Sequence, residues 1–162
     1  MMRTWTPVGL AAVASAVLCV LAVSVPSFVR NVHASYVSEA TSGVSELAAR
    51  TAARLEAAHA TSALPDSAPL TPSSVPRGAR VKDPPGTWDH PTWHALEFGF
   101  AMPHAYAFAF NAEVTPELAK FGAVAHGDLD GDAVLSTIAL EGSYRPGKPV
   151  ELSPMDVQHE IE

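Results

Sequence analysis

The sequence has a single cysteine, Cys19, and no cluster of lysine or arginine residues. One cysteine cannot pair within the chain, so there is no disulfide framework, and its position in an apolar stretch favours a plain packing role. A nucleic-acid surface needs clustered positive charge, whereas the formal net charge is −7 and the acids lie mostly in the later half. We therefore predict no nucleic-acid partner.

Motifs for catalysis are also missing. The sequence contains neither a Gly-x-Ser-x-Gly elbow nor a glycine-rich phosphate loop, and Ser136 and Thr137 lie in an apolar run typical of a strand. His90 and His94 have a spacing that can suit zinc on a helix, but Pro91 lies between them and no cysteine supports them. We predict that the protein is not an enzyme and needs no cofactor.

Between Arg3 and Arg30, no side chain except that of Cys19 is ionisable, and residues 8–25 are almost entirely Ala, Val, Leu and Ser. At about 1.5 Å per residue, a helix of this length reaches across a hydrocarbon core of roughly 30 Å. The sequence therefore predicts a transmembrane segment at about residues 8–29. Arg3 precedes this segment and acids dominate after it, which favours a cytoplasmic N-terminus.

The helical pattern continues to about residue 60 and becomes amphipathic. Apolar and small residues recur at steps of three and four, which is the period of one helix face. The predicted buried face consists of Val37, Ala40, Val44, Leu47, Ala48, Thr51, Leu55 and Ala58. We expect one N-terminal helix over residues 1–60.

The remaining chain divides by composition into three parts. Residues 61–92 are rich in proline and form a predicted connecting loop, because proline cannot sustain a helix or a central strand. Residues 93–145 alternate like strands and predict a small antiparallel β domain, and residues 146–162 form an acidic tail. The predicted fold class is α+β, with a long N-terminal helix whose first half spans the membrane, packed on a four-stranded antiparallel sheet.

Four strands are expected in the β domain. The first two lie at 93–100 and 105–110 and form a hairpin around Met102-Pro103, and the others lie at 120–126 and 134–140. Tyr106, Phe108 and Phe110 would share one strand face.

An acidic turn follows the third predicted strand. Asp128, Asp130 and Asp132 have the spacing that opens an EF-hand loop, in which alternate carboxylates converge on calcium. Ala133 and Ala139, however, occupy the positions of the turn glycine and the bidentate glutamate. A solvated tight turn explains these residues, and weak calcium binding at the three aspartates is the alternative.

Small side chains in the apolar run would let helices approach closely. The residues expected to pack against other helices in this way are Ala11, Ala12, Ser15, Ala16, Ala22 and Ser24.

The order of these parts resembles that of type IV pilins and pseudopilins. Residues 5–10 lie where that family has its Phe-Thr-Leu-Ile-Glu-Leu box, residues 26–30 resemble its Pro-Asn-Phe-Ile-Arg segment, and residues 38–40 match its Ser-Glu-Ala stretch. Segments in the later half resemble pilin-type proteins of deltaproteobacteria. These segments are residues 93–98, 103–106, 125–132 and 135–137.

The resemblance implies a membrane-anchored structural subunit of a type IV pilus or a type II secretion assembly. It implies a single-pass inner-membrane location, with the C-terminal domain in the periplasm or at the cell surface, and other pilin-like subunits as partners through the N-terminal helix. The prepilin box is degenerate at Thr4, Trp5 and Gly9, where Thr4 replaces the cleavage glycine and Gly9 replaces the glutamate. A relative that stays anchored but does not polymerise is therefore an alternative.

A cleaved export signal is the other reading of the N-terminus. Val32-His33-Ala34 places small residues where signal peptidase cuts, and Arg3 supplies a basic start. Cleavage after Ala34 would release a soluble periplasmic or extracellular binding module.

Overall fold

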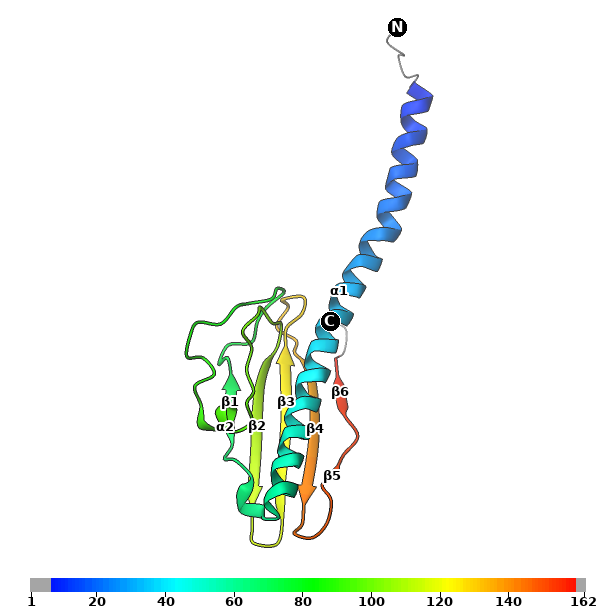
Figure 1. Ribbon diagram of the computed structural model, residues 1–162. Coiled ribbons are helices and arrows are strands. Elements are labelled where there is room, and N and C mark those ends of the chain that lie inside the picture. Colours follow the sequence, from blue (N-terminus) through cyan, green and yellow to red (C-terminus); the bar gives the residue numbers. More distant parts are fainter. Residues whose placement is uncertain (1–6, 160–162) are drawn as a thin grey trace. The chain divides into compact units, whose positions relative to one another are not determined.

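The computed structural model describes residues 7–159 and divides into two compact units, residues 1–35 and 36–162 (Figure 1). Helix α1 (Pro7–Ala58) is 52 residues long and contributes to both. The described part of the first unit is α1 up to Ser35. The second unit holds the rest of α1 and every strand found among the described residues.

The second unit is a six-stranded sheet with the order β1-β2-β3-β4-β5, and β6 also pairs with β4. All paired strands are antiparallel. The elements after α1 are η1 (Thr61–Ala63), β1 (Ala68–Thr71), α2 (Pro91–Ala95), β2 (Ala107–Val114), β3 (Ala119–Gly127), β4 (Ser136–Tyr144), β5 (Glu151–Leu152) and β6 (Asp156–Gln158).

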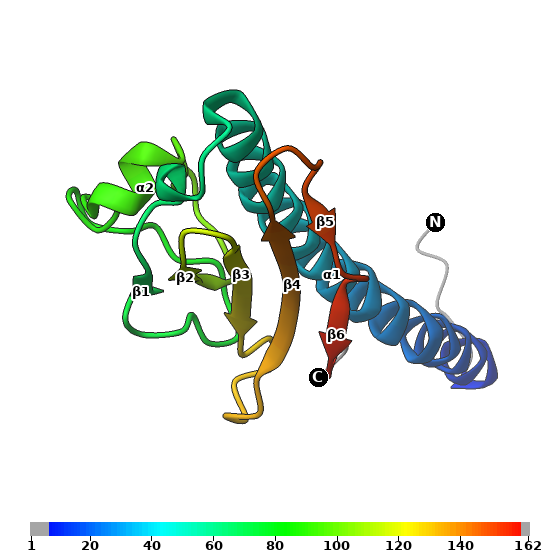
Figure 2. The same cartoon turned by 90° about the horizontal axis from the view of Figure 1, so that it is seen from below.

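Within this unit, the last turns of α1 lie along one face of the sheet (Figure 2). The predicted apolar face of the helix is confirmed from Val37 to Leu55, whereas Ala58 is exposed. Alternate residues of β3 and β4, including Phe121 and Ile138, are buried towards the helix. The core therefore lies between the amphipathic part of α1 and this face.

A group of aromatic rings extends the core towards β1 and α2. Trp88 lies 5.6 Å from Trp93 and 5.7 Å from Phe98, ring centre to ring centre, and Phe98 lies 5.2 Å from Phe108. The indole N–H of Trp93 donates to the Thr71 hydroxyl at 3.0 Å. Edge-to-face packing and a partner for the buried N–H are what such side chains require.

The predicted strand at 93–100 is wrong, because α2 forms there instead. His90 accepts a hydrogen bond from the Thr92 N–H at 3.2 Å and so caps the helix, and Pro91 takes the first helical position, where a missing N–H costs nothing. At the C-terminal end of α2, the Arg50 guanidinium donates hydrogen bonds to the carbonyls of Leu96 and Glu97. The predicted hairpin around Met102-Pro103 is consequently wrong as well.

The predicted four-stranded sheet is also wrong, because the sheet has six strands. Strands β2, β3 and β4 overlap the predicted strands at 105–110, 120–126 and 134–140. Strand β1 arises inside the proline-rich segment, and β5 and β6 arise in the acidic tail. These three strands are short and each pairs along one edge only, so the sequence has no long alternation of apolar and polar residues that would predict them.

The predicted transmembrane segment at about residues 8–29 is also wrong, which further corrects the fold class. Among the described residues, none of the helices combines the length and the apolar character needed to cross a bilayer. Seven of residues 8–25 are alanine or serine, whose small side chains add little to transfer into hydrocarbon compared with leucine or valine. This finding contradicts the predicted single-pass inner-membrane location with a cytoplasmic N-terminus and a periplasmic C-terminal domain.

Two glycines of the sheet differ sharply in the space around them, which gives a matched test of the packing. A Cβ at Gly142 would lie 2.2 Å from the buried Phe121 ring, whereas a Cβ at Gly122 would meet only the Asn111 Cβ at 3.9 Å. We expect Gly142→Ala to destabilise the fold by about 2 kcal/mol or more. Gly122→Ala should change stability by less than about 1 kcal/mol, in the stabilising direction. Urea unfolding of both variants measures the difference, and equal costs would contradict the packing described.

Candidate functional site

The predicted helix-packing residues belong to α1. The side chains of Ala11, Ser15, Ala16, Ala22 and Ser24 are exposed. Gly9 is part of α1, the side chain of Ala12 lies outside the described residues, and so do Thr4 and Trp5. Packing against another helix therefore stays a prediction.

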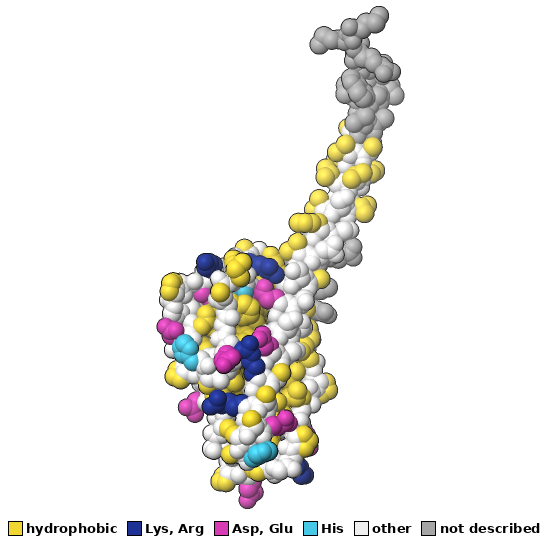
Figure 3. Space-filling model, in the orientation of Figure 1, with side chains coloured by type: hydrophobic (Ala, Val, Ile, Leu, Met, Phe, Trp, Pro, Cys, Tyr) yellow, Lys and Arg dark blue, Asp and Glu magenta, His cyan; other side chains and the backbone are white. Residues whose placement is uncertain are grey.

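Large apolar side chains are exposed on the same part of α1, and the sequence interpretation did not name them as a packing surface. They alternate with the small residues along the helix, and Figure 3 shows hydrophobic side chains distributed along it. Their exposed fractions are 51% for Val17, 66% for Leu18, 63% for Val20, 50% for Leu21, 70% for Val23, 54% for Val25 and 68% for Phe28. We refer to these seven residues as the apolar surface of α1. The signal for it was the same uncharged run that predicted a membrane span.

The acidic turn follows β3 and brings its three aspartates together, with one ligand-type oxygen of each within 4.8 Å of the others. Asp128 is buried and accepts hydrogen bonds from the N–H groups of Gly131 at 2.8 Å and Ala133 at 3.2 Å. Asp130 and Asp132 are exposed and accept bonds from backbone N–H groups two residues further on. The contacts of Asp130 and Asp132 are those of Asx turns, and Asp128 accepts from N–H groups three and five residues further on, so the local backbone accounts for all three residues.

A cation of the protein itself also faces this turn. The Arg77 Nε lies 3.3 Å from the Asp128 carboxylate, which compensates the buried charge. Ala133 has φ of 76°, the left-handed conformation that a glycine would supply at this position of an EF-hand loop. The backbone shape of such a loop is thus present at Ala133, while calcium binding by Asp128, Asp130 and Asp132 stays a prediction.

Residues 76–88, here termed the strap, are held on the second unit by charged groups. The Arg80 guanidinium lies 3.1 Å from the Glu39 carboxylate of α1, and Glu39 also accepts a bond from the Ala105 N–H at 2.7 Å. Val81 and His104 exchange two backbone hydrogen bonds, at 2.9 and 3.0 Å. The strap is therefore fixed although it contains little regular structure.

The strap also supplies the partner of a buried histidine. The Asp83 carboxylate lies 2.7 Å from Nε2 of His104 and accepts a bond from the Trp88 indole at 2.8 Å. Nδ1 of His104 lies 2.7 Å from the Tyr106 carbonyl. Both ring nitrogens thus face acceptors, and both bonds form together only when the ring carries two protons or Asp83 keeps its own.

The side chains of His90, His94 and His126 do not converge. His90 caps α2, and His94 lies 3.4 Å from Asp89 at the surface. His126 is half-buried on β3 and shares a hydrogen bond of 2.9 Å with the Thr137 hydroxyl across the sheet. Within the described residues, no three of these imidazoles gather into a zinc site.

The two hydroxyl residues considered for catalysis are engaged in the sheet. Ser136 is buried, and its hydroxyl lies 3.0 Å from the Tyr106 hydroxyl. Thr137 bonds to His126 as described. Both therefore serve as cross-strand and core contacts.

Comparison of the chain with protein-family models, with curated proteins and with solved structures found no match. The resemblance to pilins depends on the sequence motifs alone and stays a prediction.

The buried and the exposed aspartates of the turn should differ in their effect on stability. Asp128→Ala leaves two backbone N–H groups and the Arg77 guanidinium without their acceptor, and we expect a loss of about 2–3 kcal/mol. Asp130→Ala removes one exposed local bond and should cost less than about 1 kcal/mol. Chemical unfolding without added metal measures both. A larger cost for Asp130→Ala would show that the turn is organised differently.

The pH dependence of stability should carry a contribution from His126. Burial lowers the pKa of the His126 imidazole below its ordinary value of 6.5, because the partly buried ring is poorly solvated when charged. The unfolded chain then binds this proton more readily than the folded protein, so stability falls as the pH drops through about 6.5. We expect thermal unfolding between about pH 7.5 and 5.5 to show a smaller decline in His126→Gln than in the parent protein. Parallel declines would contradict the assignment.

Proposed function

We propose that the protein is a non-enzymatic, pilin-like or pseudopilin-like structural subunit of a type IV pilus or type II secretion assembly, and that copies join through α1. The observation that carries the proposal is the apolar surface of α1. Its seven side chains are all at least half exposed. A soluble monomer seldom leaves more than a few hundred Å² of contiguous apolar surface open to water.

The direction of these side chains favours several neighbours over one. Successive residues of a helix are about 100° apart, so Leu18 and Val20 project about 160° from each other. A single flat partner covers one of them and leaves the other in water. A bundle of helices from several copies covers both.

The area is also of the right order. Seven half-exposed Val, Leu and Phe side chains offer on the order of 700 Å², close to the about 800 Å² that each partner contributes to an ordinary stable interface. Alanines and serines between them permit close approach of a second helix. Since Gly9 replaces the glutamate of the pilin box, such an assembly would depend on apolar contact instead of a charge pair.

A charge placed on the apolar surface of α1 tests the proposal. We expect the full chain to sediment as an oligomer in analytical ultracentrifugation and Leu18→Glu to shift it to monomer, because a buried unpaired carboxylate is costly. Ser45→Glu, at an exposed position of α1 in the second unit, is the matched control and should leave the oligomer intact. A parent chain that is monomeric at every concentration would refute self-assembly.

An exported binding module is a second candidate, favoured by a specific observation. The compact second unit begins at Tyr36, two residues after the predicted cleavage at Ala34. All strands of residues 7–159 lie after this point, so cleavage would leave the sheet and its packed helix whole. N-terminal sequencing of the protein from its native source separates the candidates: a start at Ser35 supports the module, and retention of the part of α1 before Ser35 supports the structural subunit.

A further inference from the structure

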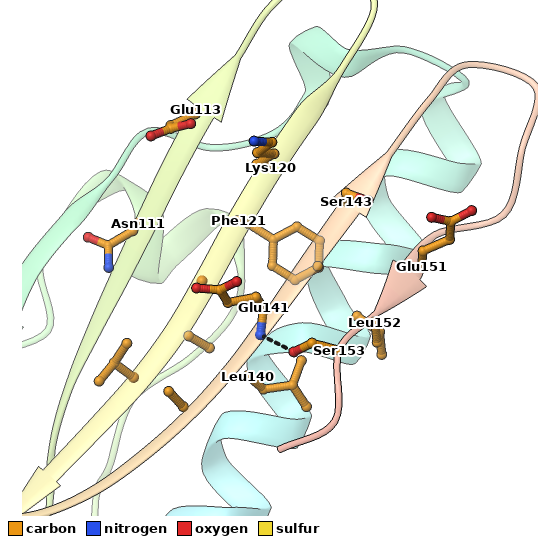
Figure 4. Close-up of a pocket in the computed structure, with 15 residues that line it drawn as sticks. Asn111, Glu113, Lys120, Phe121, Leu140, Glu141, Ser143, Glu151, Leu152 and Ser153 are labelled. Carbon is orange, nitrogen blue, oxygen red and sulfur yellow. Dashed lines mark hydrogen bonds between the residues drawn. The ribbon is translucent and has the colours of Figure 1, made fainter. Parts of the chain in front are cut away.

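The sheet carries an open trough on the face that points away from α1 (Figure 4). It crosses β2, β3 and β4, ends at β5 and has a volume of about 610 Å³, a size that accommodates a substantial ligand group. The residues that define the trough are Asn111, Gly122, Val124, Ala139, Glu141 and Leu152.

Gly122 lies on β3 in the middle of the trough, and the fold itself does not require a glycine there. It pairs in register with Asn111 on β2 and Glu141 on β4, and it is not among the residues with positive φ. A Cβ there would meet only ordinary contact. Glycine within a strand costs about 0.5–1 kcal/mol relative to alanine, and such a glycine often marks close approach by a ligand or another chain.

Four charged side chains line the trough and form what we call its rim: Glu113, Lys120, Glu141 and Glu151. Glu113, Glu141 and Glu151 contribute three carboxylates against one ammonium, that of Lys120. Within the described part of the chain, none of these four side chains has a hydrogen-bond or ion-pair partner. Their counterparts around the strap are paired: Asp83 with His104, Glu39 with Arg80 and Asp128 with Arg77.

We propose that the trough binds arginine side chains of a basic peptide or protein segment. The aliphatic part of an arginine would lie on Gly122, Val124 and Ala139, and its guanidinium would reach the carboxylate of Glu141 or a neighbouring rim acid. An arginine has both parts, an apolar stem and a planar cationic head that bonds carboxylates through two N–H groups.

The charge of the trough selects this partner over a second copy. The trough is lined by three carboxylates and one ammonium, so two troughs facing each other would bring like charges together, whereas a basic segment is attracted to the carboxylates. The trough and the apolar surface of α1 belong to different units, so the proposal does not depend on self-assembly.

The test uses the full chain and a fluorescein-labelled hexa-arginine peptide, with binding followed by anisotropy at low ionic strength. We expect saturable binding that Glu141→Gln weakens about fivefold, the size of one exposed ion pair. Gly122→Trp, which fills the trough from an open position, should abolish binding. Asp130→Asn removes an equal charge from the exposed acidic turn and should leave binding unchanged.

Three results would overturn the proposal: no saturable binding, equal weakening by Asp130→Asn and Glu141→Gln, or unchanged binding in folded Gly122→Trp. Circular dichroism checks the fold of each variant, and if Gly122→Trp does not fold, NMR shifts at Gly122 and Val124 on titration with the peptide replace it. Loss of self-association in Gly122→Trp without peptide binding in the parent would assign the trough to a copy interface and refute the proposal. The Leu18→Glu variant should bind the peptide normally, so failure of self-assembly is distinguishable.

Discussion

The close approach of α1 to the sheet is the constraint on which the second unit depends. A Cβ at Gly43 would lie 2.6 Å from the Phe108 ring, so the helix can rest on that ring only because the residue has no side chain. The neighbouring helix residues, Ala40 and Ala48, and the strand residues, Ala123 and Ala125, are also small and fully buried or nearly so. Dense packing at short range follows from this set, and larger residues at these positions would separate the layers.

Hydrogen bonds and ion pairs hold the strap, which the packing of helix against sheet does not fix. The strap contains no long strand, and its backbone is held by the two hydrogen bonds between Val81 and His104. Its charged residues Arg77, Arg80 and Asp83 pair with Asp128, Glu39 and His104. Asp83 and His104 are almost wholly buried, so each is tolerable only because the other is present. In this part of the molecule, charge serves to fix an irregular segment over an aromatic core.

The success of the sequence interpretation followed the length of each periodic pattern. The buried face of α1 was predicted correctly from Val37 to Leu55, and β3 and β4 overlap their predicted ranges, because these periods persist over many residues. The helix α2 was missed because five residues cannot show a period, and the cap at His90 and Pro91 was the available signal. The membrane span was inferred from length and missing charge, without weighing how little alanine and serine contribute to transfer into hydrocarbon.

The candidate sites were predictable to the extent that their residues are neighbours in sequence. The acidic turn is contiguous and was found, but its role in holding the backbone at Asp128 depends on Arg77 from a distant segment. The trough gathers Asn111, Gly122 and Glu141 from three strands, so it exists only after the strands pair in this register. The main evidence for the trough is that the packing does not require a glycine at position 122. The acidic side chains that line the trough also have no ion-pair partner within the described residues. Because the trough offers charge and the apolar surface of α1 offers none, the two surfaces select partners of opposite chemistry and need not compete for one.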